Sequence, residues 1–564
     1  MNRTPLITYL KHSIDPARLR VIDKRCVLIS SLESILFSVM TAMGIQLDRE
    51  GTISYGASFA VSLLFLLLIS FWFFYTTNRY LVVKHKQPQR AIEIDEGAAW
   101  HLPTAIGFLV VCSIIWYLVF FPGVYWYDAP SWLKEWSDPS EVITSKFSIP
   151  YTWLFYMFAS FGHEHLGSYE SGLALFSAVQ AILVLYAEIR IVVFLHNRFK
   201  HWIACLLPSL FFGLHPLFAI LMFSTAQDTP FMAFAGLIGI HLYEMVTEPE
   251  SYWASKKKIA CYAAAILLFC FSRNNGIYAI AFVIPFCFAY KQGLRCKLAL
   301  VTALPLVVFA LYHGPLLNTI GVDTSSAIRE MSNIPVQQVA RTYNYKYETL
   351  STVEIEEIES LIPKDALETY KAYPSISDAL KSNLNVEKLS SDPLASLELY
   401  FKLGFDHPGT YTEAALMSNL GLWCPGKQYP DSRIYHPWIE CACATPSLYW
   451  PDANLVDMHS QSKIQPVYSV ITFLFGWDRQ HFAQIPVFGT KCRSAVYFWL
   501  LVFAIGFVLY SRQYERLVFL APFIGIVLTI LLAPVVIFRY IAPLAFCAPL
   551  IIALLFEPPE KSLT

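Results

Sequence analysis

The sequence is poor in charge, since only 15% of its 564 residues are Asp, Glu, Lys or Arg, whereas soluble domains average about 25%. Apolar residues make up 56% of the chain and the mean hydropathy is +0.47, which excludes a soluble enzyme. Twelve cysteines are ordinary usage for this length and exclude a secreted disulfide scaffold. A net charge of −1 leaves no positive excess for binding nucleic acid. We therefore expect a membrane protein without a nucleic-acid partner.

Two further features are missing. Residues 1–26 are polar and basic, and no small-residue cleavage site follows the first apolar run, so we expect no cleaved signal peptide. No internal repeat is visible, and no inverted repeat of the kind found in transporters stands out. Neither a secreted protein nor an obvious repeat transporter is indicated.

Long apolar runs are what the chain does contain. A bilayer core needs roughly 17–25 apolar helical residues per crossing. Residues 259–290 are apolar except for Arg273-Asn274-Asn275 at their middle, and lysines or arginines flank both ends. This pattern predicts two short helices joined at the Arg-Asn-Asn turn, which brings the total to about 12 crossings. The other ten spans are expected at about 27–47, 54–78, 103–121, 169–195, 203–223, 230–247, 298–316, 495–511, 517–536 and 541–556.

The distribution of basic residues predicts the orientation of these spans. With the N-terminus inside, the inner segments carry about 21 Lys and Arg and the short outer loops about five. We therefore expect a multi-pass protein of the plasma membrane with both termini in the cytoplasm.

Four regions follow from this topology. Residues 1–100 hold the cytoplasmic N-terminus and two additional spans, and residues 101–316 hold a transmembrane core with the first outer loop. Residues 317–494 are polar and are expected to form a small, mainly helical extracytoplasmic domain. Residues 495–564 hold the C-terminal spans and a short cytoplasmic tail. The expected fold is thus an all-α polytopic membrane protein.

Asp128 is the first candidate for chemistry. It follows the third span after a Pro122-Gly123 turn, among aromatic residues typical of the headgroup level. A partly desolvated carboxylate there could act as a general base. Alternatively, Asp128 is the N-cap of a helix that begins at Ala129-Pro130. The residues alone leave both interpretations open.

Asp228 occupies the tight outer turn between the fifth and sixth spans. Asp before Thr229-Pro230 is also a common N-cap, and the turn is expected on the same side of the membrane as Asp128. Two carboxylates could hold a divalent metal through oxygen ligands. No third acidic ligand is fixed by spacing, so no metal site and no definite cofactor are predicted.

Arg273 and Arg539 are the basic residues of the outer turns that contain them. A guanidinium near the interface can bind a phosphate through several directed donors. The alternative is ordinary contact with lipid headgroups. Two arginines expected at the level of two aspartates favour a shared site for a phosphate-bearing lipid.

Six motifs carry a resemblance to a known family. They are Pro122-Gly123 before Asp128, Asp228 after a Ser-Thr turn, Arg273-Asn274-Asn275-Gly276, Ile334-Pro335-Val336-Gln337-Gln338-Val339-Ala340-Arg341, His407-Pro408-x-x-Tyr411 and Arg539-Tyr540-x-x-Pro543. From about residue 100 to 550, this order resembles an uncharacterised bacterial multi-pass membrane family, a domain of unknown function. That family is similar to the GT-C class of membrane glycosyltransferases. The sequence departs from it at Phe147-Ser148-Ile149-Pro150, where a His-Pro is usual, and at Gln227, where a Lys is usual.

The resemblance implies an enzyme that moves a sugar from a polyprenyl-phosphate carrier to a cell-envelope glycan or lipid acceptor on the outer face, with inversion at the sugar. It implies Asp128 as the base and Asp228 as a second catalytic residue. The donor phosphate would be bound by Arg273, Asn274, Arg539 and Tyr540. The acceptor would be bound by Gln337, Gln338, Arg341 and His407.

Two other functions remain as alternatives. A polysaccharide polymerase or ligase would use the same face with a glycan-diphosphate donor. A lipid or glycan flippase would place its ionisable groups near the bilayer midplane on broken helices. The expected clustering of charge at one face favours the enzyme.

Overall fold

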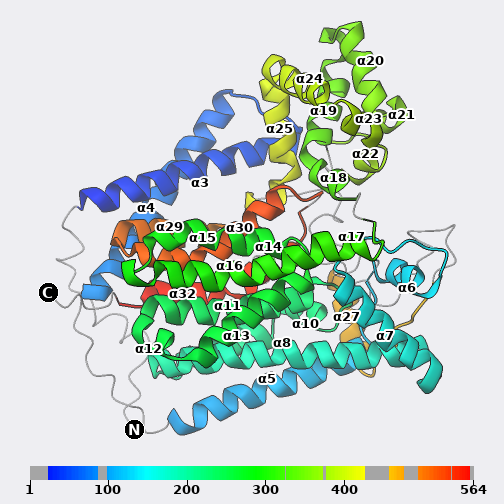
Figure 1. The fold of residues 1–564 in the computed structure, drawn as a ribbon. Helices are drawn as coiled ribbons and strands as arrows, with labels where there is room; N and C mark the ends of the chain where they lie inside the picture. Colours follow the sequence, from blue (N-terminus) through cyan, green and yellow to red (C-terminus); the bar gives the residue numbers. More distant parts are fainter. Residues whose placement is uncertain are drawn as a thin grey trace.

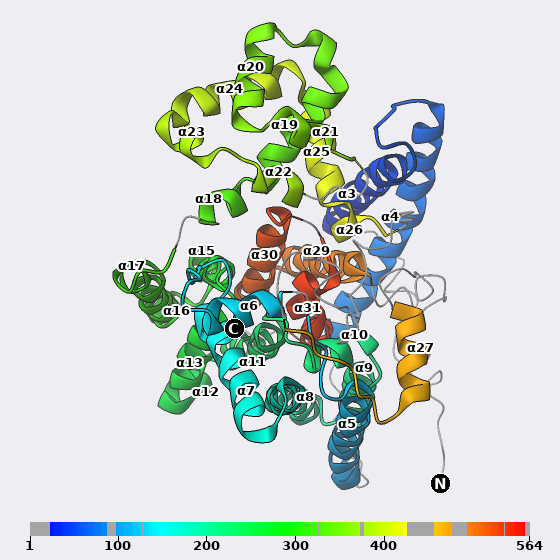
Figure 2. The same cartoon turned by 90° about the vertical axis from the view of Figure 1, so that its right-hand side faces the viewer.

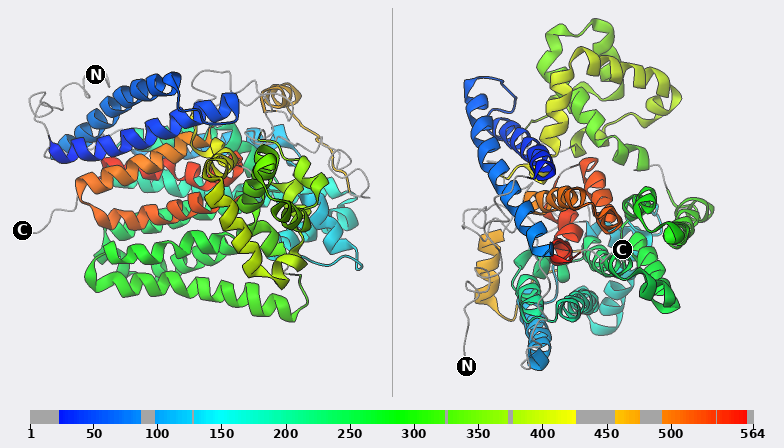
Figure 3. Two further views of the ribbon diagram at one scale, coloured as in Figure 1. Left: turned by 90° about the horizontal axis from the view of Figure 1, so that it is seen from above. Right: turned by 90° about the vertical axis from the view of Figure 1, so that its left-hand side faces the viewer.

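The computed structural model describes residues 23–86, 98–126, 128–323, 326–372, 377–425, 456–475, 493–534 and 536–558. These residues form helices, turns and two isolated β-bridges, with no extended strand among them. Long helices run side by side to form a bundle, and a group of shorter helices lies at one side of it (Figures 1 and 3). For the described residues, the expected all-α fold is confirmed.

The long helices account for the predicted spans. Nine helical segments within the described ranges are long and apolar enough to cross a membrane, so the protein is a multi-pass membrane protein. A tenth candidate consists of two helices bent by 66° at a break before Pro216. The nine are α3 (Lys24–Glu50), α4 (Ala57–Lys86), α5 (Ala98–Phe120), α8 (Tyr169–Phe199), α11 (Asp228–Thr247), α16 (Arg295–Leu311) preceded by η2 (Gln292–Leu294) and extended by η3 (Tyr312–Leu316) and α17 (Leu317–Thr319), α29 (Ser494–Ser511), η8 (Tyr514–Arg516) with α30 (Leu517–Leu531), and α31 (Phe538–Phe546) with α32 (Ala548–Phe556); the bent pair is α9 (Ile203–Gly213) and α10 (Pro216–Met222).

The predicted hairpin is present, with its tip where the sequence placed it. Helix α13 (Lys256–Ser272) ends before Arg273, and α14 begins at Gly276. The second arm is made of three short helices, and both arms are shorter than the 18 residues taken as a full span. The structure therefore supports nine or ten spans rather than establishing twelve. The second arm consists of α14 (Gly276–Ala281), α15 (Val283–Phe286) and η1 (Cys287–Ala289).

Shorter helices connect the long ones or form the side group. Helices α6 (Ala129–Ser137) and α7 (Ile149–Leu166) follow α5, whereas α27 (Gln465–Phe475) packs along α5. The short helix α12 (Pro249–Ala254) joins α11 to α13 at the base of the hairpin. The side group is α18 (Ser326–Met331), α19 (Asn333–Lys346), η4 (Tyr347–Thr349), α20 (Thr352–Leu361), α21 (Lys364–Glu368), α22 (Asp378–Ser382), α23 (Val386–Ser391), α24 (Pro393–Asp406) and α25 (Pro408–Ser418), followed by α26 (Leu420–Trp423) against α29.

The side group, α18 to α25, has a hydrophobic cluster of its own that includes Ala340, Ile358 and Leu403. Local capping explains where two of its helices begin. Ser351 and Glu354 form a capping box at the start of α20, and Asp392 caps α24 with Pro393 in the first turn. The hydrogen bonds from Ser351 lower the pKa of Glu354 to about 2. Figure 2 shows this group as a separate body beside α3 and α4.

One buried ion pair ties the side group to the turn between α3 and α4. Arg341 is fully buried on α19, and it donates to the carbonyl oxygen of Gly51 (2.6 Å) and to Glu413 on α25 (2.8 Å). Glu413 also accepts from the backbone N–H of Ile53 (2.8 Å). A buried guanidinium needs such compensation, so the pair fixes how the side group sits on the bundle.

We expect Glu413→Ala to loosen this attachment. The change leaves the Arg341 guanidinium buried without its counter-charge, which should cost about 3 kcal/mol. Denaturant-induced opening of the side group, followed by protease cleavage of the full chain in liposomes, measures the loss. Glu348→Ala removes an exposed carboxylate from η4 and is the control. Equal protection of both variants would contradict a structural role for the pair.

Candidate functional site

Two turns that are distant in sequence lie side by side. The backbone N–H of Val124 donates to the carbonyl oxygen of Phe223 (2.9 Å), and that of Thr225 donates to the carbonyl oxygen of Val124 (3.0 Å). The N–H of Trp126 donates to the hydroxyl of Thr225 (2.9 Å). This short parallel bridge holds the segment after α5 against the turn between α10 and α11, and it brings Asp128 and Asp228 to the same place.

The turn that carries Asp228 is also held from α7 and α8. The hydroxyl oxygen of Tyr151 lies 3.0 Å from the carbonyl oxygens of both Thr225 and Ala226. Gln180 accepts from Tyr151 (2.9 Å) and donates to the carbonyl oxygen of Ser224 (2.6 Å). All of these groups are buried, so the position of the turn is set by the bundle.

Four charged side chains meet at this point and alternate in sign. The Nη1 atom of Arg539 lies 3.1 Å from Oδ2 of Asp128, and its Nε lies 3.8 Å from Oδ2 of Asp228. Arg273 forms an ion pair with the other oxygen of Asp228. The order is therefore Asp128, Arg539, Asp228, Arg273, and the four formal charges sum to zero. We call these four residues the charge network.

The middle of the charge network is buried and its two ends are open. Asp228 exposes 3% of its side chain and Arg539 10%, whereas Asp128 exposes 18% and Arg273 23%. Aromatic rings cover the guanidinium groups: Arg273 lies 4.4 Å from the ring centre of Tyr540, and Arg539 lies 5.6 Å from that of Trp126. Asp128 and Arg273 are therefore the most exposed members of the charge network.

The side chain of Asp128 does not cap the helix that follows it. The residue does precede α6, but its side chain makes no cap hydrogen bond and pairs with Arg539 instead. Asp228 is the first residue of α11, where the helix dipole favours a carboxylate, yet it too is bound by guanidinium groups. Tertiary ion pairs thus replace the local capping that the sequence also allowed.

Two neighbours complete the site. The amide of Asn274 donates to the carbonyl oxygen of Ser145 (2.8 Å), so Asn274 ties the hairpin tip to the segment between α6 and α7 and is already engaged as a donor. Gln227 is 7% exposed, and its Nε2 atom has no hydrogen-bond partner among the described residues. In the sequence, Gln227 stands out only because the resembled family usually has a Lys at this position.

The residues expected to bind the acceptor lie in the side group. Gln337, Gln338 and Arg341 are buried on α19. Gln338 donates to the carbonyl oxygen of Tyr411 (3.1 Å) and accepts from Tyr400 (2.5 Å). Gln338 and Arg341 therefore bind groups of the protein itself, and their buried positions argue for structural roles.

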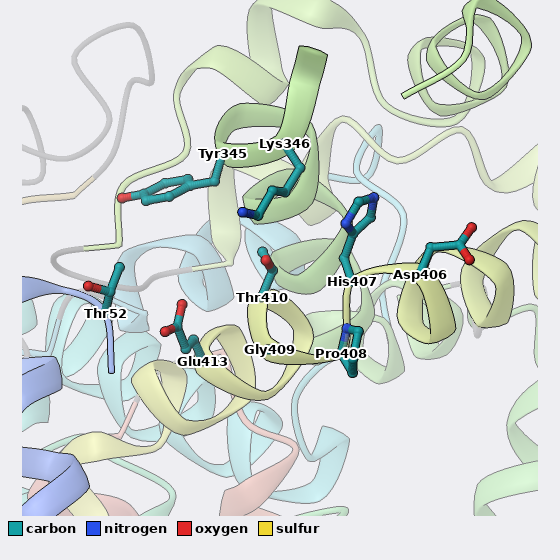
Figure 4. A pocket seen from close by; sticks show the side chains of 9 residues that line it. All are labelled: Thr52, Tyr345, Lys346, Asp406, His407, Pro408, Gly409, Thr410 and Glu413. Carbon is teal, nitrogen blue, oxygen red and sulfur yellow. The ribbon is translucent and has the colours of Figure 1, made fainter. Parts of the chain in front are cut away.

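His407 lies in a different setting. It lines an open cavity of about 430 Å³ between α24, α25 and the turn after α3 (Figure 4). The structure therefore separates His407 from the charge network. The other lining residues are Thr52, Tyr345, Lys346, Asp406, Pro408, Gly409, Thr410 and Glu413.

A metal site of three or more His, Cys, Asp or Glu side chains is not found in the described part of the chain. The two aspartates of the charge network face arginines instead. A carboxylate can accept a proton, and a guanidinium held beside it can stabilise an anion.

The fold and this site define a multi-pass helical membrane protein with a neutral arginine–aspartate network at one end of its spans. Residues 135–562 match a family described as "Family of unknown function (DUF6020)". This match covers more than half of the chain, so the protein belongs to that family. Neither the curated proteins nor the solved structures include a match to the chain.

We expect Arg539→Gln to destabilise the protein by about 2–4 kcal/mol, because it leaves two partly buried carboxylates with one guanidinium. Adding Asp128→Asn should recover part of the loss, since the double variant removes one of those carboxylates. Thermal unfolding of the purified single and double variants measures this coupling. Strictly additive losses would show that the ion pair between Arg539 and Asp128 contributes nothing to stability.

Proposed function

We propose that the protein is a glycosyltransferase of the plasma membrane that takes a sugar from a polyprenyl-phosphate carrier at the outer face. The observation that carries this proposal is the pairing of Asp128 with Arg539, with Arg273 open at the other end of the charge network. A carboxylate and a guanidinium that are both accessible are what sugar transfer from a phosphate requires.

In the proposed reaction each of these groups has one role. Asp128 accepts the proton of the acceptor hydroxyl, and the oxygen of that hydroxyl forms a bond to the anomeric carbon of the sugar. The bond from that carbon to the phosphate oxygen breaks, and its electron pair stays on the phosphate. Arg273 binds the departing phosphate, while Arg539 positions Asp128. A single displacement of this kind inverts the anomeric carbon.

The membrane arrangement of the proposal keeps both termini in the cytoplasm and counts the two arms of the 259–290 hairpin as spans, which gives about 12 crossings. The charge network then lies at the outer boundary, where the phosphate of a polyprenyl lipid would reside. The acceptor would be a cell-envelope glycan or lipid. A requirement for a divalent metal is left open by the two carboxylates.

The position of the charge network favours an enzyme over a flippase. Asp128 lies between α5 and α6, and Arg273 directly follows α13. Asp228 is the first residue of α11 and Arg539 the second residue of α31, so none of the four comes from the middle of a span. A transporter would be expected to hold its ionisable groups near the midplane.

We expect Asp128→Asn to abolish transfer, with a loss of at least about 100-fold, because general-base catalysis contributes about 10²–10⁴-fold. A deletion strain complemented with each variant is analysed for lipid-linked sugars by mass spectrometry. The unused polyprenyl-phosphate sugar should accumulate in the Asp128→Asn strain, and Arg273→Gln should raise the KM for the donor in membranes.

The matched control is Glu141→Gln, which removes an exposed carboxylate of the same loop that pairs with Lys134 at 2.7 Å. It should behave as wild type. Accumulation of a glycan diphosphate would instead indicate a polymerase or ligase. An unchanged lipid and glycan profile in a fully inserted Asp128→Asn protein would refute the proposed site.

A further inference from the structure

Helix α24 has a second apolar face that no other described part of the chain covers. Leu394, Leu397, Phe401 and Phe405 are 78%, 50%, 55% and 82% exposed. Their spacing of three, four and four residues places all four on one side of the helix. We call these four residues the α24 stripe.

The α24 stripe is not the face that packs on the side group. Leu399 and Leu403 point to the opposite side, are buried, and belong to the hydrophobic cluster of α18 to α25. A surface helix needs only one apolar face to pack on its own domain. Four large exposed apolar side chains in a row therefore mark a surface for something outside this group of helices.

The end of α24 lies where two spans emerge. Asp406 and His407 line the same cavity as Thr52, which belongs to the turn between α3 and α4 (Figure 4). Both helices are candidate membrane spans, so this turn marks a membrane surface. In Figure 1 the long helices run across the view, and α24 lies above the right-hand end of α3, at the side of the bundle.

Lipid-facing side chains continue from this turn. Tyr55 in the turn is 77% exposed, and Val61 and Leu64 in the first turns of α4 are 67% and 62% exposed, as expected for residues that meet lipid. The α24 stripe thus lies beside the headgroup region of the leaflet that α3 and α4 reach. A second copy of the chain would not explain why the apolar face lies at this level.

We propose that the α24 stripe inserts into this leaflet as an interfacial anchor. The helix carries Glu398, Lys402 and Asp406, so it has no excess of positive charge to attract anionic lipid. Insertion is driven by the Leu and Phe side chains, which suit the boundary between headgroups and acyl chains. Neutral phosphatidylcholine is therefore a sufficient surface. The inference does not depend on the proposed sugar transfer.

Photocrosslinking of the full chain in phosphatidylcholine liposomes tests the anchor. A benzophenone derivative of phenylalanine replaces Phe401 or Phe405, which keeps the ring at each position. The control carries the same group at Val353 on α20, which is 63% exposed in the same group of helices. We expect at least fivefold more lipid adduct at 401 and 405 than at 353, unchanged in 0.5 M NaCl.

Two outcomes would overturn the proposal. One is an equal yield of lipid adduct at all three positions. The other is a crosslinked product of doubled mass from positions 401 and 405 without lipid adduct, which would show that the α24 stripe binds a second copy of the chain. Thermal unfolding of each labelled protein shows that its fold is kept, so low lipid yield in a folded protein counts against the anchor.

Discussion

The contact on which the site depends is the one between Arg539 and the two carboxylates at either side of it. Asp128 and Arg539 are separated by 411 residues in the sequence. A carboxylate removed from water is costly unless a positive charge compensates it. The turns after α5 and α10 must therefore meet the start of α31 and the hairpin tip, and four separate parts of the chain are fixed in position by one alternating row of charges.

Hydropathy and residue type were enough to predict much of this arrangement. The apolar runs predicted the long helices, and the Arg-Asn-Asn break in residues 259–290 predicted the hairpin tip between α13 and α14. The order of the predicted spans alone predicted that Asp128 and Arg539 lie on the same side of the membrane. The number of spans did not follow, because the hairpin arms are shorter than a full span and α9 bends into α10. Apolar content cannot tell a short or bent helix from a crossing.

The residues of α19 show a different limit. The motif that contains Gln338 and Arg341 has polar groups that are typical of a binding site, but a sequence does not reveal which partner a side chain meets. Arg341 donates hydrogen bonds to the carbonyl oxygen of Gly51, 290 residues away, and to the carboxylate of Glu413. Asp128 likewise makes no cap hydrogen bond to α6 and pairs with Arg539 instead. Burial and long-range pairing depend on the whole fold. Residue type alone therefore could not distinguish the residues of the charge network from the buried polar residues of α19.

The two attachments of the side group have a common physical consequence. Arg341 and Glu413 hold it to the turn between α3 and α4, while Asn333 and Asn419 donate to the carbonyl oxygens of Leu532 and Leu531 at the end of α30. The chain passes from that end directly to Arg539. A group of helices fixed both to the spans and to the segment before Arg539 cannot turn freely about the bundle. Its orientation toward the membrane and the geometry of the charge network are therefore mechanically linked.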